Sequence, residues 1–129
     1  MTVRDKLISA LEGLGYPVEL QGSYTVDEIP ESCITYFIAA AEDLEHYNNR
    51  PALTGYTINV NFYSRKMSLV NTVPDLISDA LLDAGFTREG PGQDGGLDKD
   101  TGHYGWLMDF YLTERTYSNG RKIRRVYGV

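Results

Sequence analysis

The side chains best suited to catalysis are one cysteine and two histidines, Cys33, His46 and His103. Nucleophilic catalysis needs a serine or cysteine supported by a histidine and a third orienting group. Neither histidine stands in a recognisable nucleophile motif, and Cys33 lies inside the apolar run SCITYFIAA. We expect Cys33 to be a buried, inert thiol, with a reactive thiol as the alternative. The sequence therefore predicts no enzymatic activity.

The first group of residues with the composition of a metal site is acidic. It comprises Glu42, Asp43, Glu45 and His46, in the polar stretch AEDLEHYNNRPALT. A metal site is one interpretation of this group. A solvated acidic loop is the other, and it is the one that we expect.

The second group is Asp98, Asp100 and Asp109, which fall at the first, third and twelfth positions of a calcium loop. Gly102 holds the fifth position and His103 the sixth, where such a loop needs a glycine for its turn. The glycines of GQDGG lack the lysine and the strand-to-helix context of a phosphate-binding loop. We therefore expect no metal and no cofactor.

Two helices are predicted from apolar residues at helical spacing, over residues 2–14 and 68–84. Thr2 is a suitable cap for the first helix, with Asp5 in its first turn. Pro74 lies inside the second run, so either the helix is kinked there or its main part begins at Pro74. Asp75, Asp79 and Asp83 form a solvated face opposite the apolar stripe.

Alternating apolar and polar residues predict the strands of a sheet that is covered on one side. The strands are expected over residues 17–21, 32–40, 55–64, 86–89 and 103–114. Asn119-Gly120 is a tight-turn signal, which would fold IRRVYGV back as a further strand. The core is expected to contain Leu7, Leu11, Ile58, Val60, Phe62, Leu76, Ile77 and Leu81.

These elements predict an α+β fold, with a mainly antiparallel sheet of about four to five strands and two helices packed on one face. The chain has 129 residues, which suits one domain. We expect the domain to cover residues 1–116, with residues 117–129 as a basic extension.

The segments 41–54 and 90–102 are expected to be long polar loops that carry contacts with other molecules. The ten tyrosines suit protein interfaces as well as they suit strands. Our candidate interface residues are Glu42, Asp43, Tyr47, Arg50, Asp94, Asp98, Asp100, Arg121, Lys122, Arg124, Arg125 and Tyr127.

Charge is unevenly distributed along the chain. Residues 1–114 hold 18 acids and 7 bases, whereas residues 115–129 hold five bases and no acid. The basic tail is suited to an acidic face of a neighbouring subunit, to nucleic acid, or to a solubilising disordered end. We favour docking on a neighbour, because apolar residues interleave with the bases in KIRRVYGV.

Membrane association is not expected, because no apolar run approaches the roughly 20 residues that span a bilayer. The beginning of the chain, MTVRDKLISALEGLG, lacks the basic-then-apolar pattern of a signal peptide. We expect a protein made in a cytoplasm.

Four segments in a fixed order resemble a known family. They are LEGLGYPVEL, YTINVNFYSRKM, ISDALLDAGF and WLMDFYLTER. The order and spacing are similar to those of the tail-completion, or tail-terminator, proteins of long-tailed bacteriophages, over roughly residues 3–115.

The resemblance implies a structural virion protein at the junction of tail and neck, without catalytic residues. It implies a hexameric ring that ends the tail tube and joins it to the head-neck connector. The implied partners are copies of the chain, the tail tube protein and the connector protein, with double-stranded DNA passing through the ring.

Two further interpretations belong to other functional classes. The first is a small α+β binding or adaptor protein that acts as a monomer. The second is a small enzyme, for which the sequence offers no recognisable site. A chain that stays monomeric in every assembly would favour the first of these.

Overall fold

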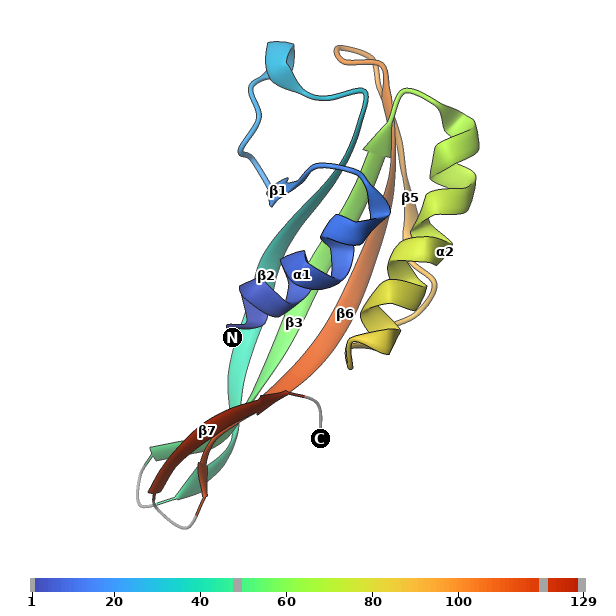
Figure 1. Ribbon diagram of the computed structural model, residues 1–129. Helices are drawn as coiled ribbons and strands as arrows, with labels where there is room; N and C mark the ends of the chain where they lie inside the picture. The colour runs from blue at the N-terminus through green and yellow to red at the C-terminus, as the bar shows by residue number, and fades with distance from the viewer. Residues whose placement is uncertain (1, 48–49, 119–120, 128–129) are drawn as a thin grey trace.

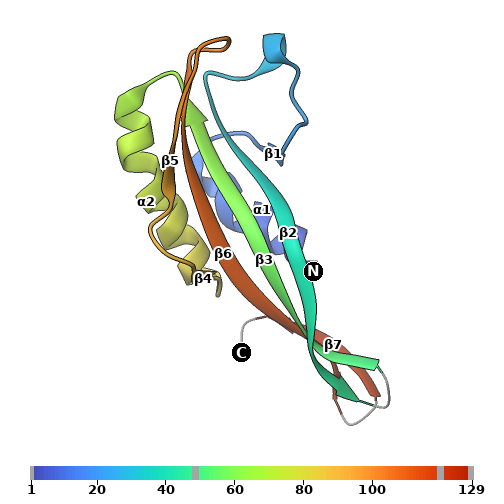
Figure 2. The ribbon, with the colours of Figure 1, turned by 180° about the vertical axis from the view of Figure 1, so that it is seen from behind.

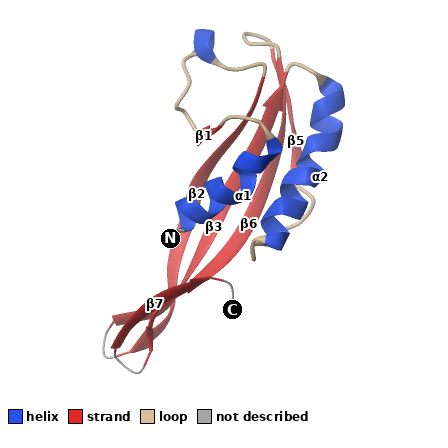
Figure 3. Cartoon of the chain, in the orientation of Figure 1, coloured by secondary structure: helices blue, strands red, loops and turns tan. Residues whose placement is uncertain are grey.

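The structure, a computed structural model, describes the backbone of residues 2–47, 50–118 and 121–127, and the side chains of residues 2–45 and 53–115. Two α-helices and seven strands are found there (Figure 1, Figure 3). The helices are α1 (Val3–Leu11) and α2 (Met67–Asp83). The strands are β1 (Val18–Leu20), β2 (Ser32–Tyr47), β3 (Arg50–Ser64), β4 (Thr87–Arg88), β5 (Gln93–Asp98), β6 (His103–Ser118) and β7 (Arg121–Tyr127).

The described strands form one mixed sheet around three long strands. β2, β3 and β6 are antiparallel neighbours in that order, and β1 pairs with β2 in parallel. The edge of β6 that faces away from β3 pairs with three short strands along its length, first β5, then β4 and then β7. The expected α+β class is confirmed. The expected four to five strands are too few, because short strands cover separate parts of β6.

Both helices cover the same face of the sheet, as the view from behind shows (Figure 2). α1 begins with a capping box, in which the side chains of Thr2 and Asp5 each accept a hydrogen bond from the other residue's backbone N–H. The helices bury Val3, Leu7, Leu11, Val70, Val73, Ile77 and Leu81 against Ile34, Ile58, Val60, Phe62, Met108, Phe110 and Leu112 of the sheet. The predicted apolar faces of the three long strands are thus confirmed.

α2 continues through Pro74, so the alternative start at Pro74 is wrong. The expected core position of Leu76 is also wrong, because its side chain is 52% exposed. The buried stripe follows Val73, Ile77 and Leu81, and Leu76 lies about 100° around the helix from Ile77. An apolar residue at the margin of a stripe cannot be separated from the stripe by spacing alone.

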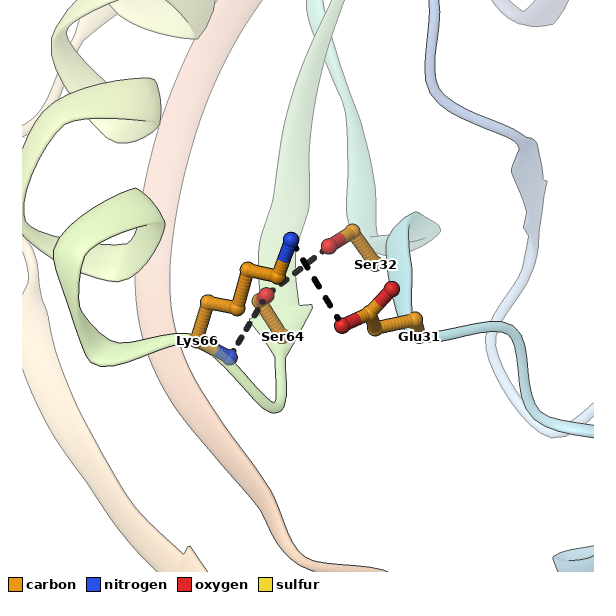
Figure 4. Close-up of polar contacts among 4 residues, drawn as sticks. All are labelled: Glu31, Ser32, Ser64 and Lys66. Carbon is orange, nitrogen blue, oxygen red and sulfur yellow. Dashed lines mark hydrogen bonds and ion pairs between the residues drawn. The ribbon is translucent and has the colours of Figure 1, made fainter.

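A buried serine joins the start of β2, the end of β3 and the start of α2 (Figure 4). The Ser64 hydroxyl oxygen lies 2.8 Å from that of Ser32 and accepts the backbone N–H of Lys66 at 3.0 Å. The Lys66 ammonium lies 3.8 Å from the Glu31 carboxylate. Lys66 caps α2 without a side-chain hydrogen bond, so Ser64 supplies an acceptor near this helix terminus.

Both segments expected as loops contain strands. Residues 41–47 continue β2 and residues 50–54 begin β3, so the polar excursion is a long hairpin. Residues 93–98 form β5, and a Cβ atom added to Gly95 would lie 3.4 Å from the backbone of Gly105 on β6. Alanine, acidic residues and glycine are poor strand formers, and cross-strand pairing overrides their preference here.

The predicted return of the chain after residue 120 is confirmed. β7 pairs with the end of β6 in an antiparallel hairpin, with Tyr127 opposite Glu114 and Arg121 opposite Ser118. The turn residues 119–120 lie outside the described residues. None of the described helices is long and apolar enough to cross a membrane.

Phe62→Ala should lower the free energy of unfolding by about 2–5 kcal/mol, because Phe62 is fully buried in the core and packs edge-to-face with Tyr16. Leu76→Ala is the matched control and should cost less than about 1 kcal/mol. Chemical denaturation of both variants measures the difference. Equal losses would show that the assigned stripe of α2 is wrong.

Candidate interaction surfaces

The sheet extends well beyond the helices at one end and forms an arm there (Figure 1). We define the arm as residues 40–47 of β2, 50–55 of β3, 113–118 of β6 and all of β7. Asp43 pairs with Thr54, Thr54 with Glu114, and Glu114 with Tyr127. The arm is therefore four strands wide, with β2 at one edge and β7 at the other.

The face of the arm that lies opposite the helices carries one buried apolar side chain, that of Leu53. Leu53 is 8% exposed, although no helix covers it. Leu53 is the strand partner of Glu45 on β2 and of Arg115 on β6. The side chains of Arg115 and Glu45 form an ion pair at 3.1 Å. Because both charges are partly exposed, the ion pair adds little stability and serves mainly to cover Leu53.

A tyrosine packs directly on a glycine at the base of the arm. A Cβ atom on Gly55 would collide with the Tyr111 hydroxyl group and would lie 3.1 Å from Leu44. Tyr63 lies over Gly105 in the same way, at the other end of this face. Aromatic rings that cover glycines on a sheet protect the exposed backbone and help to fix the register.

A cavity of about 310 Å³ opens on this same face, between the loop that follows β1 and the end of β5. Its walls include Cys33, Thr35, Tyr63 and His103. The Thr35 hydroxyl group donates a hydrogen bond to the side-chain oxygen of Gln21, which closes one side. The cavity has a mixed apolar and polar lining and contains the only described histidine side chain of the chain.

The groups in this cavity are poorly arranged for nucleophilic chemistry. Burial raises the pKa of the Cys33 thiol from its ordinary value of 9.0 to about 11, so the thiol stays protonated near neutral pH. His103 Nε2 lies 2.7 Å from the carbonyl oxygen of Pro30, and because a carbonyl can only accept, Nε2 carries the proton. The expected burial of Cys33 is confirmed.

The acidic groups do not converge. Asp98 accepts the backbone N–H of Asp100 in the turn after β5, while Asp109 accepts the side chain of Asn59 near the middle of β6. Asp98 pairs with His103, and the six residues from there to Asp109 span roughly 20 Å of strand. Among the side chains that the structure describes, no three ligand groups lie together as a metal site.

The first acidic group lies on a strand rather than in the expected loop. Glu42, Asp43 and Glu45 are exposed along the outer strand of the arm, and the side chain of His46 lies outside the described residues. Neighbouring residues of a strand point to opposite faces, which separates Glu42 from Asp43. Asp75, Asp79 and Asp83 are exposed on α2, as predicted.

The structure divides the candidate interface residues into two groups. Asp94, Asp98 and Asp100 are exposed on β5 and the turn that follows it, far from the arm (Figure 1). The backbone of the others belongs to the arm. The side chains of Tyr47, Arg50, Arg121, Lys122, Arg124, Arg125 and Tyr127 lie outside the described residues.

Sequence reasoning missed two features of this region. Glu114 is a strand residue that is only 2% exposed, and it shares a small cavity with Thr2, Val3 and Arg4 at the amino end of α1. A carboxylate is favoured near the positive end of a helix dipole. The packing of Tyr111 on Gly55 was also missed, because it depends on the register of β3 and β6.

Gly55→Ala should displace Tyr111 and lower the free energy of unfolding by about 1–3 kcal/mol. Adding Tyr111→Ala should make the Gly55→Ala change far less costly, because the collision is gone. Gly13→Ala is the control, since no atom lies within 4 Å of the added Cβ there. Denaturation of the single and double variants gives the coupling, and additive losses would contradict the contact.

The burial of Cys33 predicts an alkaline loss of stability. Between pH 9.0 and about 11, the unfolded thiol loses its proton while the folded thiol keeps it, so the free energy of unfolding falls as pH rises. Below pH 9.0, the stabilisation that the buried, protonated Cys33 thiol contributes is fully present. Cys33→Ala should show a shallower fall in denaturation experiments across this range. Parallel curves for the variant and the wild type would contradict the raised pKa.

Comparison of the chain with known protein families found no family that matches. Comparison with curated proteins found none with significant similarity. The likeness to tail-completion proteins therefore depends on the order and spacing of the four sequence segments, and its consequences for function are proposals.

Proposed function

We propose that the chain is a structural subunit that assembles with copies of itself into a ring, which ends the tail tube of a long-tailed bacteriophage and joins it to the head-neck connector. The observation that carries this proposal is the arm. It is a four-stranded extension with outer strands whose outward edges pair with no other described strand, and it projects from a small helix-covered body (Figure 2).

The shape of the arm supports assembly more than action as a monomer. Unpaired backbone groups on exposed strands are ready templates for pairing with another chain. The described part of the chain already has a closed core beneath α1 and α2, and the arm adds little to it. A stretch of sheet that the core does not need is suited to contacts between molecules.

The charge of the body supports the passage of DNA through a ring. The whole chain has a net charge of −6. The arm holds six bases and four acids, so the body outside the arm, with 14 acids and six bases, carries a net charge of −8. An acidic lining would repel phosphates, so that DNA slides through without binding. No catalytic step belongs to this function.

The proposal is tested by measuring the mass of the protein, first alone and then after mixing with tubes of the tail protein from the same virus. We expect rings, either in solution or only at the ends of tubes, and we expect capped tubes to stop growing. Electron microscopy of the mixture shows where the rings lie. The monomeric adaptor is the correct alternative if the protein stays monomeric in both conditions and tube length is unchanged.

A further inference from the structure

The two edges of the arm lack a neighbouring strand among the residues that the structure describes. β1 pairs only with residues 34–36 of β2, so no described strand pairs with the outer edge of β2 from Phe37 to Tyr47. β7 pairs only with β6 among the described strands. Each copy of the chain therefore offers two strand edges, at opposite sides of the same sheet.

The sequences of these two edges carry opposite charges. Residues 37–47 of β2 hold three acids, Glu42, Asp43 and Glu45, and no lysine or arginine. β7 holds four bases within seven residues, Arg121, Lys122, Arg124 and Arg125, and no acid. The two edges are thus complementary to each other, and each is repelled by a second copy of itself.

We propose that β7 of one copy adds as a strand to the outer edge of β2 in the next copy, so that the arms form one continuous sheet around the assembly. This inference rests on the proposed ring and names the surfaces that would close it. Backbone hydrogen bonds supply the attachment, as in other cases of strand addition, and the charges select the partner edge.

The charge pattern also determines the symmetry of the contact. Pairing β2 with β2, or β7 with β7, would give a two-fold dimer but would place like charges opposite each other. Pairing β2 with β7 uses a different surface on each copy, and such head-to-tail contacts produce closed rings when the rotation is suitable. The like-charge repulsion therefore disfavours the two-fold dimer and favours the head-to-tail contact that a ring requires.

The irregularities of β2 fit an edge that must accept only one partner. The register of β2 against β3 shifts between Ile38 and Ala40 and twice more between Asp43 and His46. Bulges and charges on an edge strand hinder general aggregation. A basic strand with a matching twist can still pair with β2. The acids of β2 attract its bases, whereas they repel an acidic edge.

Two charge-reversed variants test the pairing. The first carries Glu42→Lys and Asp43→Lys, and the second carries Arg124→Glu and Arg125→Glu. The first variant alone places basic positions 42 and 43 against the basic β7, and the second cancels the net positive charge of β7, because its two new acids offset Arg121 and Lys122, so we expect the assembly of each to weaken about tenfold or more. In an equal mixture, the basic positions 42 and 43 of the first variant can meet the acidic positions 124 and 125 of the second, and the unchanged β7 of the first can meet the unchanged β2 of the second. The mixture should therefore form alternating rings, as native mass spectrometry can show.

Matched controls change the same number of charges outside the arm. Asp75→Lys with Asp79→Lys reverses two exposed acids of α2, and Arg88→Glu with Lys99→Glu reverses two exposed bases. Both controls should assemble as the wild type does. Circular dichroism shows whether each variant is folded. Should a variant fail to fold, hydrogen exchange on the wild type replaces it. Alternate amides of residues 37–47 and 121–127 already bond β3 or β6, and the remaining, outward-facing amides should be protected only in the ring.

The outcomes separate this inference from the proposed function. Wild-type rings with unaffected variants, or variants that do not recover when mixed, would overturn the strand addition while the ring remains. Rings whose outward-facing amides at residues 37–47 and 121–127 exchange as fast as in the monomer would overturn it too. A wild type that forms no ring, even with tail tubes, would overturn the proposed function itself.

Discussion

The antiparallel pairing of β3 with β6 is the interaction on which the rest of the structure depends. It runs without a register shift from Leu53 opposite Arg115 to Ser64 opposite Tyr104. At one end, this pairing places Val60 and Met108 under the helices. At the other, it carries both strands past the helices into the arm. A slip by one residue would turn the core face outward and would also remove Tyr111 from Gly55.

The parts of the fold that periodicity determines could be predicted from the sequence. α1, α2 and the central parts of the three long strands follow from apolar spacing, and the cap at Thr2 follows from residue type. The extension of β2 through Glu42 and the strand β5 could not be predicted, because their residues have low strand propensity and pair only through a partner. Leu76 was misplaced because spacing does not locate the margin of a buried stripe.

The candidate interaction surface, like the fold, could be predicted only in part from the sequence. Its charged residues could be selected from composition, but the sequence suggested a loop and a separate tail. The structure joins them as opposite edges of one sheet, since β3 and β6 lie between β2 and β7. The cavity near Cys33 could not be predicted, because Thr35, Tyr63 and His103 come from three strands. An acidic edge and a basic edge on one rigid sheet favour repeated head-to-tail contacts over a two-fold dimer.

A cryo-electron microscopy reconstruction of tails that contain this protein would test the central claim most directly. The account predicts a ring of this chain at the end of the tail tube nearest the head, with an unbroken sheet that passes from β2 of each copy to β7 of the next. A ring at that position whose copies meet through α1 or α2, with both arm edges unpaired, would contradict the assembly described here. Absence of the chain from that end of the tail would contradict the proposed function.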